Sequence, residues 1–471
     1  MAVFIPQHHH GITSCSTRFR HLAPLLQALY ASRPTVHAYL AHVTRPNQKI
    51  GFREFVALIA ALTALNALAI DAMLPALPQI GTALGVTTDN KRQWVITAYL
   101  LGVSSTQVVY GVLADRFGRK RVLLTGVELY AVFAPSAAFA TTFTQLVWAR
   151  AFMGAGAAAL QVLAVSIIRD RFAGAQMARV MSLTFMVFLT APVLAPSIGQ
   201  AILSVSGWRT IFGFLATFSL VLMTWATLRL PETLHPDDRL PLDVRRVAHA
   251  FRTVFGSRMT AGYMLAAACV LGGLFGFITS VQQVFTDIFH APTLFPLIFA
   301  AVAMGMAASS LLNSRIVERL GVRYVSHRAL VGFLVFGGVH WLVARGGYES
   351  IATFALLQGA MMFCFGMIAA NFASIAMEPL GHVAGTGSSI YGSITMAVGS
   401  TLGFAIGQQF DGTAVPLYAR IRARPARRWA AWPSRNGECC SDGPGRSATA
   451  GLKCGAIGAH PSRRHVSKQR L

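Results

Sequence analysis

Acidic residues are scarce in this chain, and so is charge in general. Only 17 of its 471 residues are Asp or Glu, and charged residues make up 12% of the sequence, against about 25% in an ordinary soluble domain. Hydrophobic residues make up 54%, and the mean hydropathy is +0.54. This balance argues against a water-soluble fold and favours a protein that is solvated largely by lipid.

Cysteines and the motifs of common enzyme sites are also sparse. The sequence contains no phosphate-binding loop, no recognisable Ser-His-Asp set and no HExxH-type metal motif. A histidine tract at 8–10 could hold a metal ion, although a plain polar arm is the simpler interpretation. We therefore expect no enzyme, no cofactor and no metal centre. The six cysteines show no metal-ligand spacing: Cys15, Cys269, Cys364, Cys439, Cys440 and Cys454.

Apolar runs recur along most of the chain, with lengths close to the roughly 17–25 residues that a spanning helix needs. Because lipid offers backbone polar groups no partner and strand alternation is absent, these runs should be helices. A large soluble helical core is the alternative, but such long apolar runs are rare there. We expect an all-α membrane protein with eleven spans, near residues 55–77, 93–114, 122–140, 145–168, 180–203, 210–230, 260–284, 294–313, 329–345, 351–377 and 387–409.

Basic residues are concentrated in alternate loops. Such loops stay in the cytoplasm, so we expect a multi-pass inner-membrane protein with a cytoplasmic N-terminus. The net charge of +23 does not indicate a nucleic-acid partner, because no basic helix carries interleaved aromatic residues. The loops after spans two, four and eight hold Arg116, Arg119, Lys120, Arg121, Arg169, Arg171, Arg179, Arg315, Arg319, Arg323 and Arg328, with exceptions elsewhere at Lys91, Arg92, Arg209 and Arg345.

An internal repeat relates two parts of the chain. Span two ends in GVLADRFGRKR (111–121), and span eight ends in SRIVERLGVR (314–323). Aligning Gly118 with Gly321 places an acidic residue, a basic residue and the glycine in the same order in both. The charged segment 231–258 between them is typical of a cytoplasmic linker. Two six-helix halves joined in this way are the layout of a transporter that rocks around a site at the membrane midplane.

Five segments resemble motifs of one family. ARAFMGAGAAA (149–159) resembles the span-four motif of the major facilitator superfamily, and APVLAPSIGQ (191–200) resembles its span-five antiporter motif. AIDAMLPALPQI (69–80) and GTGSSIYGSI (385–394) narrow the likeness to its Bcr/CflA drug-resistance branch. The resemblance covers about residues 52–415 and implies the major facilitator fold and a proton-coupled exporter of small-molecule drugs. The loop 2–3 signature is matched at Gly111, Leu113, Ala114, Asp115, Arg116, Gly118, Arg119 and Lys120.

The residues of the loop signature also indicate a role through their chemistry. Glycine lets backbone pass closely at a helix end, and Asp115 can cap a helix, pair with Arg119 or pair with a basic residue of another helix. Positive-inside anchoring would explain the arginines alone, but it needs no acid. We expect a latch that holds one conformation and opens on rocking, formed by Gly111, Asp115, Arg116, Gly118, Arg119 and Lys120, with Glu318 and Arg319 in the repeat.

Asp71 is a carboxylate in span one that precedes Pro75 and Pro78. It lies about 24 Å along the helix at 1.5 Å per residue. Removal from water disfavours the charged carboxylate, so the group could carry a proton when facing one side and lose it when facing the other. An interfacial aspartate that caps a short helix is the alternative. We expect Asp71 to couple transport to protons.

Spans three, four and five hold further candidates. Glu128 is a second membrane carboxylate, and Arg150 should face the bundle, with snorkelling to the interface as the alternative. Both are predicted to take part in proton coupling. Pro192 and Pro196 share one face of span five and each removes a backbone donor. With Gly199 they predict a bent, closely packed helix at a mobile interface.

Several polar residues lie inside the apolar spans. Asn66, Tyr99 and Gln107 are candidates for lining a substrate cavity. Hydrogen bonding between helices is the simpler role for any one of them.

The two ends differ in composition from the rest. Residues 1–50 contain no Asp or Glu and are typical of a disordered arm or of sequence upstream of the true start. Beyond the halves at 51–230 and 259–410, the segment 411–471 carries closely spaced arginines that cannot form a membrane helix. Its composition suggests a shifted reading frame that replaces the twelfth span. We therefore predict a monomeric drug:proton exporter, with a non-transporting remnant or a membrane sensor as the alternatives.

Overall fold

The computed structural model describes residues 50–241 and 243–419, and the regular elements in this part of the chain are helices. The first group is α3 (Phe52–Asp71), α4 (Leu77–Ala83), α5 (Trp94–Phe117), α6 (Arg119–Ala138), α7 (Phe143–Arg171), α8 (Gly174–Val205) and α9 (Arg209–Arg229). The second is α11 (Arg258–Gln283), α12 (Phe295–Leu320), α13 (Val322–Arg345), α14 (Ile351–Met377) and α15 (Ala384–Gly407). The short helices α10 (Val244–Gly256) and α16 (Val415–Ala419) precede and follow the second group.

The expectation of an all-α membrane protein is confirmed. Each of the eleven predicted spans falls on a long helix, and ten helices in the described part are long and apolar enough to cross a membrane. The exception is α6, whose first turn holds Arg119, Lys120 and Arg121 and whose middle holds Glu128. It nevertheless packs against α7 and α9, which are both among the ten.

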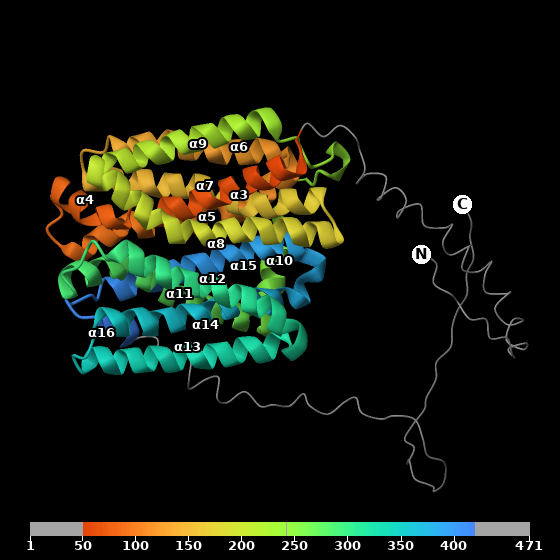
Figure 1. Cartoon of the computed structure of the whole chain (residues 1–471). Helices are drawn as coiled ribbons and strands as arrows, with labels where there is room; N and C mark the ends of the chain where they lie inside the picture. The colour runs from red at the N-terminus through yellow and green to blue at the C-terminus, as the bar shows by residue number, and fades with distance from the viewer. Residues whose placement is uncertain (1–49, 242, 420–471) are drawn as a thin grey trace, which may run out of the picture. The chain divides into compact units, whose positions relative to one another are not determined.

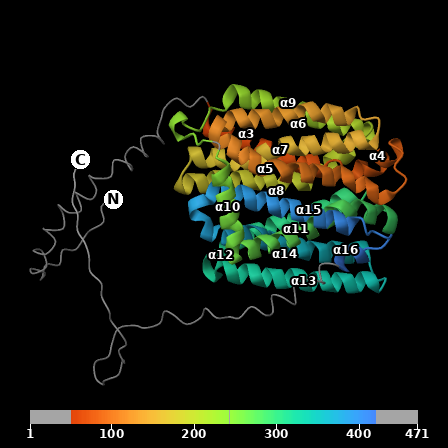
Figure 2. The same cartoon turned by 180° about the vertical axis from the view of Figure 1, so that it is seen from behind.

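The helices assemble as two groups that meet along two seams. In Figures 1 and 2 the red to yellow-green helices before residue 230 lie together, and the green-to-blue helices after residue 258 lie together. α5 packs against α15 at one seam, and α8 packs against α12 at the other. The seams are therefore the surfaces that must slide or part if the groups move relative to each other.

The repeat seen in the sequence has a matching backbone. Gly118 lies between α5 and α6 with φ 103° and ψ 149°, and Gly321 lies between α12 and α13 with φ 82° and ψ 148°. An L side chain rarely adopts such a positive φ. At Gly118 a Cβ would also collide with the carboxylate of Glu232. Glycine is required here for both conformation and space.

α10 lies inside the predicted linker 231–258. The Asp243 side chain caps it by accepting a hydrogen bond from the backbone N–H of Arg245 at 2.8 Å. Ala250 and Val254 are buried against the second group of helices. The linker is thus docked on the bundle through an apolar face.

The last described helix, α16, is anchored by Tyr418, and Leu417 beside it is also buried. Tyr418 is buried, stacks on His340 with ring centroids 3.8 Å apart, and donates a hydrogen bond to Gln358 Oε1 at 3.1 Å. His340 also contacts Glu349 Oε1 at 3.0 Å through Nε2. The predictions for the N-terminal arm, apart from its last residue, Ile50, and for residues 420–471 lie outside the described residues.

We expect Tyr418→Ala to destabilise the protein by about 3 kcal/mol, since a large buried ring is lost and Gln358 loses a partner. The measurement is the thermal unfolding midpoint of the purified chain. Tyr348→Ala is the matched control, because Tyr348 is 81% exposed. Equal midpoints for the two variants would contradict the anchoring role.

Candidate functional site

The first group of helices encloses a cluster of buried polar side chains. Arg150 of α7 is fully buried, and so is Tyr99 of α5. Asn66 and Asp71 of α3 are 7% and 4% exposed. Tyr130 of α6 contributes a buried hydroxyl without a hydrogen-bond partner among the described residues. Four helices thus converge on one polar centre inside an otherwise apolar bundle.

Arg150 ties three helices together at this centre. Its Nε donates to the Val95 carbonyl at 3.0 Å, and one terminal nitrogen donates to the Ala69 carbonyl at 2.9 Å. The guanidinium lies over the Tyr99 ring, 4.4 Å from its centroid. Because α3 ends at Asp71, the carbonyls of its last turn are open to donors from outside the helix. The snorkelling alternative for Arg150 is wrong, since the side chain points into the bundle.

Asp71 is the last residue of α3 and is held away from water. The helix breaks after it, and a short turn at Leu74–Ala76 and α4 take up the two prolines of this stretch. Asp71 Oδ1 has no hydrogen-bond partner, and no ion pair joins Asp71 to a basic side chain within the described ranges. A buried carboxylate without a counter-charge is costly when ionised and cheap when protonated. This environment suits a group that binds and releases a proton.

The other predicted proton-coupling carboxylate lies elsewhere. Glu128 is on the exposed side of α6, so the structure does not bring it to Asp71 and Arg150. Hydropathy places Glu128 in a span but does not say which way its side chain faces.

The span-five motif lies directly behind Asp71. α8 continues unbroken through Pro192 and Pro196. At Gly199 a Cβ would collide with the carbonyl oxygen of Ala72, the residue after Asp71. The predicted close packing is therefore present, and its partner is the end of α3. The closest contact of α8 with this part of the chain is therefore at the backbone beside Asp71.

The three predicted cavity residues divide between two places. The Tyr99 hydroxyl donates to Asn66 Oδ1 at 2.6 Å, so this pair bonds α5 to α3. Gln107 donates to Gln161 Oε1 at 3.1 Å and lines a separate cavity of about 230 Å³ with Gly111 and other residues of α5, α7 and α15. Asn66 and Tyr99 thus act as helix-to-helix contacts, and Gln107 lines a cavity.

The loop signature forms an ion-pair cluster at one end of the helices, called here the latch end. Arg119 pairs with Asp115 at 2.6 Å and with Asp170, at the end of α7, at 3.0 Å. The Arg119 backbone N–H donates to Glu232 Oε1 at 2.7 Å. Lys120 donates to the Thr227 carbonyl at 2.8 Å. Of the roles considered for Asp115, the structure contains the ion pair with Arg119. Asp170 and Glu232, which belong to other segments, also bind Arg119.

The repeat of the latch in the second group uses other residues. Glu318 and Arg319 are exposed, and neither forms an ion pair in the part of the chain that the structure describes. Arg323, which aligns with Lys120, instead pairs with Glu378 at the end of α14 at 3.1 Å. The assignment of Glu318 and Arg319 to the latch is not supported by these contacts. Arg116 of the first motif is likewise exposed.

A network of amide side chains joins the two groups at the opposite end. We call Asn90, Gln93, Gln283 and Gln408 the amide clasp. Gln93 donates to Gln283 Oε1 at 2.7 Å and to the Gly407 carbonyl at 3.0 Å, and it accepts from Gln408 at 3.1 Å. Gln283 donates to Asn90 Oδ1 at 3.0 Å.

The remaining clasp bonds run to the backbone. Asn90 Nδ2 donates to the carbonyls of Gln408 and Phe410 at 3.1 and 3.0 Å, and Gln408 Nε2 donates to the Asn90 carbonyl at 2.6 Å. Trp94 and Phe404 pack beside them with ring centroids 4.4 Å apart. The clasp closes the α5–α15 seam at this end without any charged group. Sequence reasoning missed it, and the only signal was amide residues placed at span ends.

We expect Gln93→Ala to favour separation at the clasp end by about 3 kcal/mol, because three hydrogen bonds of about 1 kcal/mol each are lost. Spin labels at Thr87 and Thr413, in a background with the native cysteines replaced, would report a larger population of long distances. Gln409→Ala is the control, since Gln409 bonds only within its own helical turn. An unchanged distance distribution in Gln93→Ala would contradict the role of the clasp.

The comparison with known proteins gives one family. The family model described as Major Facilitator Superfamily matches residues 59–404. The chain belongs to the Major Facilitator Superfamily. The two helix groups, the glycine-turn repeat and the ion-pair cluster are therefore parts of a transporter of that superfamily.

Relatives in this superfamily carry drug-resistance names. The bicyclomycin resistance protein homolog of Haemophilus influenzae is 29% identical over 79% of this chain and 93% of its own length. The chloramphenicol resistance protein of Pseudomonas aeruginosa is 28% identical over 71% and 79%. The resemblance to the Bcr/CflA drug-resistance branch is thereby confirmed.

Solved structures of similar fold are more distant in sequence. The xylose transporter XylE from E. coli matches with a TM-score of 0.62 and 12% identity, over 82% of this chain and 100% of that chain. At this identity the likeness concerns the fold alone.

Proposed function

We propose that this chain is a drug:proton antiporter of the inner membrane, which exports small-molecule drugs in exchange for protons. The observation that carries the proposal is the environment of Asp71: a buried carboxylate, without a basic partner among the described residues, beside the contact between α3 and Gly199 of α8. The names of the relatives, which refer to bicyclomycin and chloramphenicol resistance, support drugs as the cargo.

The exchange follows from the two protonation states of one carboxylate, Asp71. When the proton leaves Asp71, a negative charge remains in a site with little water, and this state favours a rearrangement that brings water or a donor to it. When the proton binds, the neutral side chain packs without that cost. Drug and proton need only favour opposite conformations for each to drive the other.

The two conformations differ in which end of the helix bundle is closed, the latch end or the clasp end. With the N-terminus in the cytoplasm, the latch end faces the cytoplasm and the amide clasp faces outside. The Arg119 ion pairs lie just after the C-terminal end of α5, at one end of the α5–α15 seam. The clasp closes the same seam at its other end. Release of drug to the outside requires that the hydrogen bonds of the clasp break. The glycine turns let the helices that they join move as rigid units.

The experiment is drug accumulation in proteoliposomes that hold the full-length chain. We expect labelled chloramphenicol to accumulate when the lumen is more acidic than the medium, and to leave when an ionophore collapses the pH gradient. Empty liposomes control for passive partition. Equal accumulation with and without the gradient would refute proton coupling, and no transport in either condition would favour the non-transporting remnant.

A further inference from the structure

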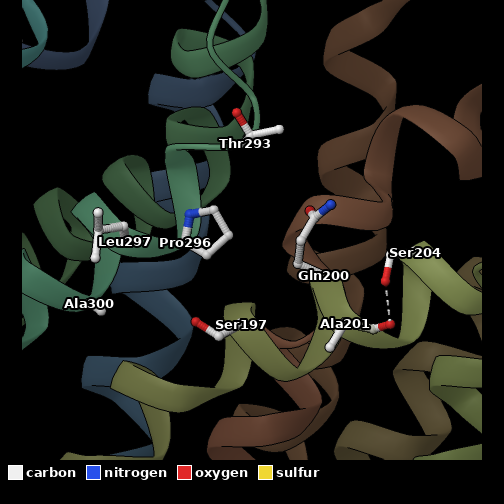
Figure 3. Close-up of a pocket in the computed structure, with 8 residues that line it drawn as sticks. All are labelled: Ser197, Gln200, Ala201, Ser204, Thr293, Pro296, Leu297 and Ala300. Carbon is white, nitrogen blue, oxygen red and sulfur yellow. Dashed lines mark hydrogen bonds between the residues drawn. The ribbon is translucent and has the colours of Figure 1, made fainter.

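A groove separates α8 from α12 at the clasp end of the helices. It has a volume of about 410 Å³, within the roughly 300–1,000 Å³ of small-molecule pockets. Figure 3 shows α8 and α12 with the eight residues that line the groove. The lining residues follow the helical pattern i, i+3, i+4 and i+7 on each side, which brings one face of each segment to the groove: Ser197, Gln200, Ala201 and Ser204 opposite Thr293, Pro296, Leu297 and Ala300.

The lining combines four polar and four apolar residues, and none of them is charged. Ser204 is bonded within its own helix, since its hydroxyl donates to the Ala201 carbonyl at 2.8 Å (Figure 3). The Gln200 carboxamide, by contrast, makes no hydrogen bond to another residue of the described part. It therefore keeps two N–H donors and one oxygen acceptor for a ligand. Pro296 and Leu297 across the groove offer an apolar wall.

The groove lies near the ends of the helices, on the last turns of α8 and the first turns of α12. Ser204 is one residue from the end of α8, and Thr293 is two residues before the start of α12. From Ser197 to Ser204 the helix rises only about 10 Å. Polar side chains at this depth need neither lie in hydrocarbon nor be fully hydrated. Such a position suits a molecule with one polar and one apolar side.

The groove is one helix away from Asp71. Gly199 lies between Ser197 and Gln200 on α8. Its backbone is in close contact with the Ala72 carbonyl. A ligand that pushes α8 and α12 apart therefore also acts on the contact that holds the end of α3. This arrangement links occupancy of the groove to the backbone beside the buried carboxylate.

We infer that the α8–α12 groove is a binding subsite for small uncharged amphipathic molecules that carry hydroxyl or amide groups. Gln200 hydrogen-bonds the polar groups, and Pro296 and Leu297 pack against the apolar body. The absence of charge from the lining disfavours cations, because no carboxylate is present to pair with them. The inference rests on the proposed export function and names the class of substrate that this part of the protein accepts.

The test measures equilibrium binding to the full-length chain purified in detergent. Labelled chloramphenicol, which is neutral and carries hydroxyl and amide groups, is the first probe, and tetraphenylphosphonium is the cationic probe. We expect Gln200→Leu to weaken chloramphenicol binding about five-fold, the equivalent of one net hydrogen bond. Gln176→Leu, an exposed glutamine at the other end of α8, should leave binding unchanged.

A second variant fills the groove. Ala201→Trp should abolish chloramphenicol binding, with an unchanged thermal midpoint to show that the chain is folded. If wild-type chain binds chloramphenicol and both variants bind it equally well, the subsite is refuted while the export function stands. Binding of tetraphenylphosphonium alone would also overturn the inference and leave export intact. Binding of neither probe, together with no gradient-driven transport, would refute both.

Discussion

Replacement of Asp71 by Asn is expected to abolish drug accumulation driven by a pH gradient. Asn has nearly the same shape as Asp but cannot bind or release a proton. The pH gradient can therefore no longer drive transport through this residue. One pH unit is worth about 1.4 kcal/mol per proton, so a gradient of about 2 units supports up to about a 100-fold drug ratio for one-to-one exchange. The variant should reach a ratio of about 1 in the same vesicles.

Two control variants separate the roles of charge and position. Asp71→Glu keeps a carboxyl group and should retain part of the accumulation. Glu128→Gln removes the exposed carboxylate of α6 and should accumulate drug like the wild type. Full accumulation in Asp71→Asn would show that the coupling proton binds elsewhere, and a loss in Glu128→Gln would return that residue to the coupling pathway.

Gly199→Ala is expected to give the largest loss of stability among single methyl additions. The added Cβ would collide with the backbone carbonyl of Ala72, and a backbone atom cannot rotate away as a side chain can. Overpacking of this kind costs about 1–3 kcal/mol or more. We expect the thermal midpoint to fall and the variant to transport poorly, because α8 must shift from the end of α3.

Gly213→Ala is the matched control for this prediction. Gly213 lies in α9, and a Cβ there meets no atom within 4 Å. Alanine also favours helix over glycine by about 1 kcal/mol, so this variant should be as stable as the wild type or slightly more so. If Gly199→Ala behaved like Gly213→Ala, the close contact between α8 and α3 would be absent in the protein in solution.

Much of the fold could be predicted because the forces involved are local. Backbone groups in lipid must bond within their own helix, so apolar runs in the sequence predicted the eleven helices, including α6, the least apolar of them. The turn at Gly118 followed from glycine in a charged motif, and the backbone there has the positive φ that only glycine adopts easily. The interior position of Arg150 followed from the cost of exposing a guanidinium to lipid.

The contacts between helices could not be predicted in the same way. Asp170, Glu232 and Glu378 are far in sequence from the basic residues that they bind, and hydropathy says nothing of how helices rotate about their axes. The same limit explains Glu128, which lies in the expected span but faces outward. The amide clasp depends on three segments that are far apart in the sequence, represented by Gln93, Gln283 and Gln408, and helix packing brings them together.

The measurement that tests the central claim most directly is proton movement caused by drug. A pH-sensitive dye is enclosed in proteoliposomes at equal pH on both sides, and chloramphenicol is then added outside. Antiport predicts that drug entering the lumen drives protons out, so the lumen becomes alkaline in vesicles with wild-type chain and stays constant in those with Asp71→Asn. An alkaline shift of equal size in both, or drug entry without any shift in the wild type, would contradict proton exchange at Asp71.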